Sequence, residues 1–359
     1  MKYNQLGNTG VLVSELCFGT MTFGGKGMWE SIGHVAQDEA NGLMKTAIDN
    51  GINFIDTANA YSEGLAETIL GQSLKDLGIN RQQVVLATKL RIRTGPGANQ
   101  VGLSRLHIAD SVNDSLRRLQ TDHIDLLYIH GVDPITPLEE TMRGLDDAVV
   151  AGKVRYIGVS NHPAWMVTKA NGIADKMGWT KFVAGQYYYN IASRDAEREI
   201  IPMTMSEKIG LMPWSPLAGG FLSGKYTRSK ESAGDSRRDT FDFPPLNKEK
   251  TFNIIDLLIE TGKNHNVSAA RVALAWLRNR PGVTSIIIGA KRQEQLVDDI
   301  ASLQLQLTEE EIRKLNEISE LSPEYPGWMV PWQARDRFPE SATQPEAQHQ
   351  HEPEYEHQH

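Results

Sequence analysis

The sequence is poor in cysteine, in long apolar runs and in positive charge, and each deficit excludes a class of protein. A single cysteine, Cys17, among 359 residues rules out an intrachain disulfide and suits a reducing compartment. No apolar run approaches the roughly 18 residues that a transmembrane helix needs, and Met1–Gly10 lacks the apolar centre of a secretory signal. The net charge of -8 argues against nucleic acid or an anionic membrane as a partner. We therefore expect a cytoplasmic protein that binds neither.

Apolar residues are also scarce from about Ser341 onward, where the chain consists mainly of Gln, Glu, Pro and His. Such a composition cannot build a core, so residues 339–359 are predicted to form a disordered tail. No cysteine or fixed scaffold accompanies the histidines of this tail, so we expect them to take up metal at most adventitiously and predict no metal site. These histidines are His349, His351, His357 and His359.

What the sequence does contain is a regular alternation of short apolar segments with longer amphipathic ones. The apolar segments predict eight strands, at Leu16–Gly19, Asn53–Thr57, Val84–Lys89, Ile124–His130, Val154–Ser160, Phe182–Gln186, Leu211–Ser215 and Ser285–Gly289. Helical patterns separate them, for example at Glu39–Asn50, Leu65–Leu77, His107–Leu119, Leu138–Ala151, Trp165–Met177 and Glu197–Lys208. The strand starts lie roughly 30–40 residues apart, the length of a β-helix-β unit. The longer gap before the last strand holds a polar loop and two helices.

Eightfold alternation of strand and helix predicts the α/β class and a closed (β/α)8 TIM barrel over residues 1–338. The alternative is an open doubly wound sheet, but the glycine-rich phosphate turn that normally follows its first strand is missing. Two short runs around Gly7–Gly10, within Lys2–Ser14, predict an N-terminal β-hairpin that could close the barrel floor. Thr308 and Glu311 form a capping-box signature for a final helix at Thr308–Ile318.

Charged and hydrogen-bonding side chains stand at the carboxyl ends of nearly all the predicted strands, and these ends meet on one rim of such a barrel. A single polar residue at a strand end is more often a satisfied surface group, but so many on one rim predict an active site. These residues are Asp56, Lys89, His130, Ser160, Asn161, Gln186, Trp214, Ser215, Lys291 and Arg292.

The stretch Asn53–Tyr61, N-F-I-D-T-A-N-A-Y, carries a carboxylate and a phenol just beyond a buried strand. Taken alone, Asp56 could cap a turn and Tyr61 could be a packed aromatic residue. A tyrosine has an ordinary pKa of about 10, and a nearby lysine cation, here Lys89 oriented by Asp56, lowers it towards the working range. With His130 free to hydrogen-bond the substrate oxygen, this set suits protonation of a carbonyl oxygen as hydride reaches the carbon. Because no side chain supplies hydride, a nicotinamide cofactor is required.

The same rim offers partners for such a cofactor. Ser160, Asn161 and Gln186 could hydrogen-bond a carboxamide, and Trp214 gives a flat face on which nicotinamide could stack. The glycine-rich run at Leu217–Lys225, L-A-G-G-F-L-S-G-K, could wrap a pyrophosphate with backbone N–H groups and the side chains of its serine and lysine.

A basic pair follows the last predicted strand. Lys291 and Arg292 would suit a 2′-phosphate and so favour NADPH over NADH. Alternatively, they are a solvated surface pair.

With these residues in place, the chain resembles the aldo-keto reductases. The matching motifs, in order, are F-I-D-T-A-x-x-Y at Phe54–Tyr61, A-T-K at Ala87–Lys89, the His130 strand followed by D-P-x-T-P-L-E-E-T-M, G-K-V-R-Y-I-G-V-S-N at Gly152–Asn161, W-S-P-L-A-G-G and I-G-A-K-R. They cover about Lys2 to Glu320, in a style closest to the prokaryotic and potassium-channel β-subunit-like branches. The resemblance implies a (β/α)8 barrel without a separate Rossmann domain, binding NADP(H) extended across its rim.

The resemblance also implies a role for each rim residue. The catalytic tetrad would be Asp56, Tyr61, Lys89 and His130, with Tyr61 as the general acid in reduction. The carboxamide would meet Ser160, Asn161 and Gln186, the nicotinamide ring Trp214, and its ribose the backbone of Gly19, Thr20 and Met21. The complete set of expected cofactor contacts is Gly19, Thr20, Met21, Asp56, Ser160, Asn161, Gln186, Trp214, Ser215, Pro216, Leu217, Gly219, Ser223, Lys225, Gly289, Lys291, Arg292, Gln295 and Asp299.

Two segments depart from the family pattern. Relatives often carry an acidic residue and an asparagine that meet the adenine, whereas this chain has Asp298 and Asp299. Asp299 cannot donate as an amide does, which leaves this contact open, although Gln295 can still serve. Three consecutive tyrosines, Tyr187–Tyr189, lie near the rim, and strand alternation predicts that at least one packs between barrel and helices.

Substrate specificity would come from variable loops at Phe23–Ile32, Arg91–Gln100 and Tyr325–Trp332. We expect a pocket for a small or medium carbonyl compound, for which sugar-like or ring substrates would be suitable. Alternatively, the loops merely cover the barrel mouth. The predicted pocket residues are Trp29, Tyr61, His130 and Trp328.

The leading hypothesis is an NADP(H)-dependent reductase that converts an aldehyde or ketone to an alcohol, or catalyses the reverse reaction, with NADPH/NADP+ as cofactor. One alternative is a cofactor-binding regulatory protein with slow turnover, which the intact tetrad disfavours. A second is a lyase in which Lys89 forms a Schiff base. The sequence leaves the oligomeric state open.

Overall fold

The computed structural model describes residues 1–228, 242–335 and 337. Contacts divide the chain into two units, Met1–Ser319 and Glu320–His359. The predicted tail at 339–359 and residues 229–241 of the polar loop lie outside the described residues, so the predicted tail boundary stays a prediction. Among the described residues, the second unit contains one short helix, α12 (Met329–Ala334).

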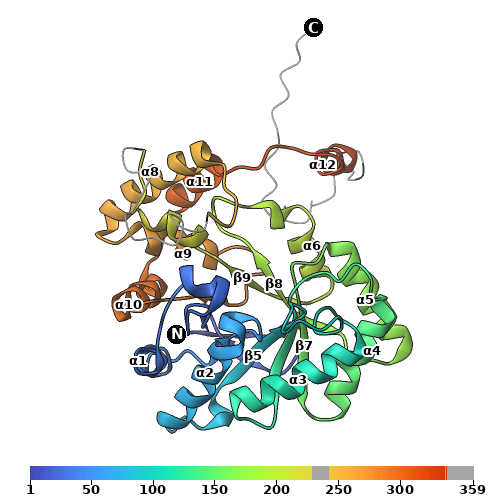
Figure 1. Ribbon diagram of the computed structural model, residues 1–359. Helices are drawn as coiled ribbons and strands as arrows, with labels where there is room; N and C mark the ends of the chain where they lie inside the picture. The colour runs from blue at the N-terminus through green and yellow to red at the C-terminus, as the bar shows by residue number, and fades with distance from the viewer. Residues whose placement is uncertain (229–241, 336, 338–359) are drawn as a thin grey trace. The chain divides into compact units, whose positions relative to one another are not determined.

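The first unit is built on an eight-stranded parallel sheet that closes on itself (Figure 1). The strand order is β10-β3-β4-β5-β6-β7-β8-β9, so neighbours in the sheet follow chain order. The two ends meet through a parallel bridge between Leu211 and Val283, and the Thr284 N–H donates to the Leu211 carbonyl at 2.8 Å. The strands are β3 (Leu16–Gly19), β4 (Phe54–Asp56), β5 (Val85–Leu90), β6 (Ile124–Ile129), β7 (Val154–Ser160), β8 (Phe182–Tyr188), β9 (Gly210–Trp214) and β10 (Ile286–Ile288). This confirms the predicted barrel.

Helices surround the strands, as Figure 1 shows for α2 to α5. Their buried faces supply the larger apolar core, between sheet and helices. Within the described ranges, none of the helices combines the length and apolar character that a bilayer crossing needs. The helices are α1 (Gln37–Asp49), α2 (Leu65–Asp76), α3 (Arg105–Leu119), α4 (Leu138–Val150), α5 (Ala164–Met177), α6 (Ile200–Ser206), α8 (Lys248–His265), α9 (Ala269–Arg278), α10 (Gln293–Ala301) and α11 (Glu309–Ile318).

Two local predictions about helices had opposite outcomes. The capping box is confirmed: the Thr308 hydroxyl accepts a hydrogen bond from the Glu311 N–H at 3.2 Å, and the Glu311 carboxylate accepts one from the Thr308 N–H at 2.9 Å. The continuous helix predicted at Glu197–Lys208 is wrong. A short 3-10 helix, η4 (Asp195–Glu197), is separated from α6 by Glu199, whose φ of -129° is not helical.

A two-stranded hairpin closes the amino end of the barrel, as predicted. Its strands, β1 (Tyr3–Gln5) and β2 (Leu12–Ser14), pair antiparallel. Gly7, with a φ of 54°, packs against the Lys208 carbonyl and the Gly210 nitrogen at the start of β9, so closely that a side chain would not fit. The hairpin contributes Leu6 and Val13 to the barrel interior.

Alternation along the strands explains how the interior changes from apolar to polar. Side chains of successive residues point to opposite faces, so every second residue points into the barrel. The interior core contains Leu6, Val13, Cys17, Phe54, Ala87, Leu126, Tyr128, Ala184 and Met212. On the barrel strands, the next inward-facing positions after these core residues are two residues later: Gly19, Asp56, Lys89, Gln186 and Trp214. On β6, Tyr128 comes next and His130 follows it after two more residues. The polar residues therefore meet at the carboxyl rim.

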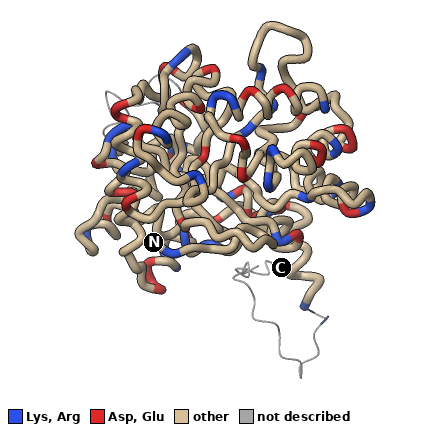
Figure 2. The backbone as a smooth tube through the Cα atoms, turned by 90° about the horizontal axis from the view of Figure 1, so that it is seen from below, with Lys and Arg blue, Asp and Glu red and all other residues tan. Residues whose placement is uncertain are grey.

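Acidic and basic residues are interspersed along the described chain (Figure 2). The charge of the first unit is therefore spread over many elements.

Candidate active site

The buried ammonium group of Lys89 is the centre of the site. Its Nζ donates to the Asp56 carboxylate at 2.5 Å, to the Thr57 carbonyl at 2.8 Å and to the Tyr61 hydroxyl at 3.1 Å. These three bonds use all the donors of an ammonium group. Lys89 is 0% exposed and Asp56 is 2% exposed, so the pair is shielded from water. Three of the four predicted catalytic residues are thus in direct contact.

Backbone bonds hold the loop between Asp56 and Tyr61 against the end of β5. The Thr57 N–H donates to the Ala87 carbonyl at 2.9 Å, and the Asn59 N–H donates to the Lys89 carbonyl at 3.0 Å. This arrangement places the Tyr61 phenol next to Lys89, although Lys89 comes later in the sequence.

The backbone directly after Tyr61 is strained. Ser62 and Glu63 have φ values of 50° and 56°, in the left-handed region that favours glycine. The Ser62 hydroxyl is buried, donates to the Phe23 carbonyl at 2.8 Å and accepts from the Gly25 N–H at 2.9 Å. These bonds tie the strained turn to the loop that follows β3.

Charge compensation keeps Lys89 protonated. Burial by itself would lower the pKa of Lys89, but the attraction of Asp56 and Tyr61 and the hydrogen bonds to them outweigh this effect, so its pKa is raised. The second Asp56 carboxylate oxygen accepts a hydrogen bond from Gln186 Nε2 at 2.9 Å. Gln186, predicted to meet a carboxamide, therefore also fixes the carboxylate.

His130 follows β6 directly and faces the phenol. The His130 and Tyr61 rings lie 6.0 Å apart, nearly perpendicular. Burial, and then the positive charges of Lys89 and Arg91, lower the pKa of His130 well below its usual range, so the imidazole is neutral. Its Nδ1 has no hydrogen-bond partner among the described residues.

Two of the predicted pocket residues come from elsewhere in the chain. Trp29, in η1 (Gly27–Ser31), packs on Tyr61 with ring centroids 5.0 Å apart. The structure thus brings Trp29, Tyr61 and His130 together. Trp328 belongs to the second unit, where it contacts Tyr325 at 6.3 Å.

The predicted nicotinamide partners bind one another at the ends of β7 to β9. Ser160 Oγ donates to the Gln186 carbonyl at 2.8 Å. Asn161, with a φ of 57°, donates to the His130 carbonyl and accepts from Trp214 Nε1, both at 3.0 Å. These bonds fix Trp214 on the rim next to His130.

The half-buried Trp214 ring contacts two other aromatic rings. Tyr188 lies 4.8 Å from it, and Phe243 lies 6.1 Å away with an interplanar angle of 13°. Sequence reasoning missed Phe243, because a single aromatic residue in a long polar loop gives no local signal. Of the three tyrosines, Tyr189 is fully buried and bonds Glu197 at 2.6 Å, which confirms the prediction that at least one packs in the interior.

The loop after β9 has an unusual backbone. Ser215, Ala218, Gly219 and Gly220 all have positive φ, at 52°, 52°, 66° and 91°. The Ser215 hydroxyl accepts from the Gly219 N–H at 2.9 Å, while Ser223 Oγ donates to the Gly220 carbonyl at 2.7 Å. Such a run turns successive N–H groups inward and is typical of anion-binding loops. Pro216 and Leu217 lie inside this turn, and Lys225 is exposed at its end.

At the other side of the rim, β3 and β10 approach closely. A side chain at Gly19 would lie 2.9 Å from Ile287, whereas one at Gly289 would meet nothing nearer than 3.7 Å. Thr20 donates to the Asp56 carbonyl at 3.1 Å, and the half-buried Met21 follows it.

The basic pair leads into α10. Lys291 and Arg292 are exposed, and Arg292 is the residue before the first turn of the helix. The Lys291 N–H donates to Gln295 at 3.0 Å, so Gln295 helps to cap this end.

Asp299 differs from the expectation that it acts only as an acceptor. It is 6% exposed, and burial, together with the neighbouring Asp298 charge, raises its pKa to about 8 against an opposing effect of Lys225. The carboxyl group is therefore protonated at pH 7 and can donate a hydrogen bond. Asp298 instead pairs with Arg271 at 2.7 Å and accepts from Ser268 at 2.6 Å.

Comparisons with known proteins agree with this geometry. The sequence model described as "Aldo/keto reductase family" matches residues 15–320. The oxidoreductase YrpG of Bacillus subtilis is 39% identical over 329 residues, which is 89% of this chain and 96% of the relative. Versiconal hemiacetal acetate reductase of Aspergillus parasiticus is 37% identical, covering 88% and 96%.

A third relative has a name that refers to a potassium channel. A protein of Oryza sativa subsp. japonica, named as a probable voltage-gated potassium channel subunit beta, is 35% identical over 90% of this chain and 98% of its own. These matches extend over nearly the whole barrel. The chain therefore belongs to the aldo/keto reductase family of oxidoreductases.

Proposed function

We propose that the protein is an NADP(H)-dependent carbonyl reductase, in which Tyr61 exchanges a proton with the substrate oxygen. The observation that carries this proposal is the fully bonded Lys89 ammonium group, 3.1 Å from the Tyr61 hydroxyl. A cation at this distance stabilises the phenolate that remains after proton donation. Asp56 holds the cation in place and balances its charge.

The neutral imidazole of His130 would orient the carbonyl. A neutral ring donates one N–H to the substrate oxygen without competing for the proton that Tyr61 supplies. Trp29 packs against the phenol and limits the access of water. The substrate would be an aldehyde or ketone, with a sugar-like or ring compound suited to this aromatic wall, or the corresponding alcohol in the reverse direction.

The rim fits an extended dinucleotide. When bound, nicotinamide supplies or accepts the hydride. Gln186, Ser160 and Asn161 are grouped beside the half-buried face of Trp214, and the positive-φ loop Ser215–Gly220 suits a pyrophosphate. At pH 7, a protonated Asp299 offers adenine the donor that a carboxylate lacks.

The two exposed cations at the start of α10 favour NADPH over NADH. We infer no nucleic acid or membrane partner, and a cytoplasmic location stays a prediction from composition.

Cofactor titration tests the proposal first, with the fluorescence of the seven tryptophans as signal. We expect NADPH to bind at least about tenfold more tightly than NADH, and a Lys291→Ala/Arg292→Ala variant to lose this preference, because it removes the charges that face the 2′-phosphate. Oxidation of NADPH is then followed with a panel of aldehydes and ketones. Binding of neither cofactor would overturn the proposal.

A regulatory cofactor-binding protein is the second candidate, favoured by the 35% identity to the potassium channel relative. Its signature is tight NADPH binding with negligible turnover of every carbonyl compound tested.

A further inference from the structure

Arg91 is held in a conformation that arginine rarely adopts, two residues beyond Lys89. Its φ is 126°, in the region that favours glycine. Strain of this kind is concentrated at ligand-binding and catalytic positions. The Arg91 carbonyl accepts from the Gly102 N–H at 2.8 Å, which helps to keep the strained backbone in place.

The Arg91 side chain is fixed beside the catalytic histidine. Its Nε and Nη2 both donate to the Val132 carbonyl, at 2.9 and 2.7 Å. Val132 lies two residues after His130, so the guanidinium lies along the segment that leaves the active site. Among the described residues, none accepts a hydrogen bond from Nη1. The edge of the guanidinium that carries Nε and Nη2 thus fixes the side chain, and Nη1 on the other edge keeps its N–H donors for a ligand.

The charge of Arg91 is not neutralised within the described part of the chain, where no carboxylate lies within ion-pair distance of it. Asp133, the residue that follows Val132, is fully engaged elsewhere. Its carboxylate accepts from the Leu103 N–H at 2.7 Å, the Thr136 hydroxyl at 2.6 Å and the Ile135 N–H at 3.1 Å. A half-buried cation without a counter-ion favours an anionic ligand.

Two buried polar side chains with unused hydrogen-bonding capacity lie around the same strand ends. His162 is 3% exposed; its Nδ1 is bonded to the Ser160 carbonyl at 2.9 Å, and its Nε2 has no described partner. Asn59 is 2% exposed, and neither of its amide atoms has a described partner. Its N–H bonds the Lys89 carbonyl, at the end of the strand from which Arg91 projects. Burial and then the charge of Arg91 lower the pKa of His162, as Arg91 also does for His130, so both rings lie within its field.

We propose that Arg91 recognises carbonyl substrates that carry a carboxylate, binding this group while the carbonyl oxygen lies between Tyr61 and His130. The inference rests on the proposed reductase function and names its substrate class. Arginine binds carboxylates through paired N–H donors, and its fixed plane here means that little side-chain freedom is lost on binding. The alternative is that Arg91 only clamps the loop after His130.

Three carboxybenzaldehydes (2-, 3- and 4-substituted) and their methyl esters separate these two roles, because each pair differs in charge but hardly in shape. We expect kcat/KM of the wild type for at least one acid to exceed that for its ester by about 10–100-fold, the usual effect of a charge-assisted hydrogen bond. In Arg91→Gln this ratio should fall to about one, mainly through KM for the acid.

Arg93→Gln is the matched control. Arg93 lies in the same loop but is exposed, and its Nη1 bonds the Gly95 and Gly97 carbonyls at 3.0 and 2.8 Å. Its loss should leave the ratio unchanged. Arg91→Gly removes the side chain while relieving the φ of 126°, so it serves if the Gln variant does not fold.

An equal loss for acids and esters in Arg91→Gln would show a loop clamp only and overturn the proposal. So would a wild type without preference for any acid. Turnover of the esters reports on the reductase function separately, so the two failures are distinguishable.

Discussion

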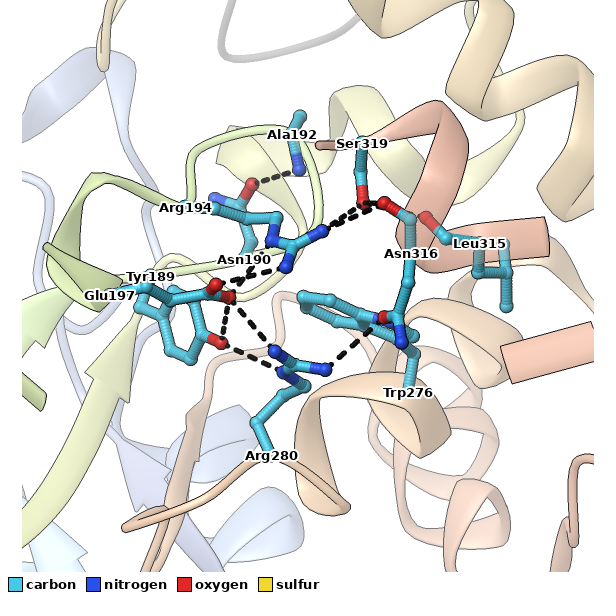
Figure 3. A network of polar contacts seen from close by, with 10 residues as sticks. All are labelled: Tyr189, Asn190, Ala192, Arg194, Glu197, Trp276, Arg280, Leu315, Asn316 and Ser319. Carbon is cyan, nitrogen blue, oxygen red and sulfur yellow. Dashed lines mark hydrogen bonds and ion pairs between the residues drawn. The ribbon is translucent and has the colours of Figure 1, made fainter. Parts of the chain in front are cut away.

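Two buried tyrosines in this molecule sit beside ionised groups of opposite sign. Tyr61 accepts a hydrogen bond from the Lys89 ammonium group at the barrel mouth. Tyr189 donates one to the Glu197 carboxylate at 2.6 Å, inside the polar network of Figure 3. Burial, and then the negative charge of Glu197, raise the pKa of Tyr189 and outweigh the opposing effect of Arg280, so this phenol stays neutral. A cation prepares a phenol to lose its proton, whereas a carboxylate prevents it.

The charged side chains of the network around Tyr189 bond to other protein groups within it. Arg194 binds Glu197 through two nitrogens at 2.9 Å each, and Arg280 donates to the Tyr189 hydroxyl at 3.2 Å. The Trp276 ring lies between the two guanidinium groups, 5.5 and 4.9 Å from them. Arg194 also bonds Ser319 at 2.8 Å, which connects the loop after β8 to the end of α11. Every charge here has a protein partner, so we read this network as structural.

The largest expected effect separates the two phenols. Tyr61→Phe should lower kcat by about 10²–10⁴, because it removes the proposed general acid, while NADPH affinity changes little. Tyr189→Phe should keep kcat but lower the free energy of unfolding by about 1–3 kcal/mol, because Glu197 and Arg280 lose a partner. Steady-state kinetics, cofactor titration and urea unfolding measure the three quantities. A Tyr61→Phe enzyme with full activity would refute the assignment.

Lys89→Met should be the most destabilising change at the mouth. Removing the ammonium group leaves the Asp56 carboxylate buried without its counter-ion, which costs about 3–5 kcal/mol. Adding Asp56→Asn removes the stranded charge, so the double variant should be more stable than Lys89→Met alone. Urea unfolding midpoints of the wild type, Lys89→Met and the double variant test this. If the double variant is no more stable than Lys89→Met, the loss of stability comes from packing.

Glu197→Gln sharpens the contrast with the network. It leaves Arg194 and Arg280 without their carboxylate and should cost about 2–3 kcal/mol, less than a fully buried pair, because Glu197 is partly exposed. NADPH-dependent activity at 25 °C should persist, since no network residue touches Tyr61 or Lys89 among the described contacts. Thermal unfolding and kcat are the readouts, and a selective loss of kcat would give the network a catalytic role.

The smallest expected effect is that of Asp299→Asn, which should stabilise the protein at high pH, whereas the substitutions above lower its stability or activity. With a pKa of about 8 instead of 3.8, the folded protein holds a proton that the unfolded chain has lost, so the free energy of unfolding falls as pH rises from about 4 to 8. Asp299→Asn should remove this dependence and raise stability at pH 9 by at least about 1 kcal/mol, the equivalent of one pKa unit.

Unfolding at pH 5 and pH 9 measures the Asp299 effect. Asp298→Asn is the neighbouring control and should instead destabilise, because it breaks the bond to Arg271. An Asp299→Asn protein that keeps the wild-type pH slope would show that another group titrates.

The barrel and the grouping of Asp56, Tyr61, Lys89 and His130 at its rim could be predicted because both depend on short-range patterns. Period-two alternation assigns Asp56, Lys89 and His130 to one rim as soon as the strands are located. The capping box at Thr308 likewise needs only neighbours in sequence. The helix predicted at Glu197–Lys208 failed because the pattern has no information on Arg280, which binds Glu197 from 83 residues away. That long-range pairing accompanies a break at Glu199.

The sequence by itself determined the order of strands and helices, the polar rim and the family to which the chain belongs, since these follow from local periodicity and motif spacing. Only the tertiary structure decided the fixed plane and strained backbone of Arg91, the protonated state of Asp299 and the closed network around Tyr189. Burial and charge pairing between distant segments set these properties, and a linear pattern contains neither.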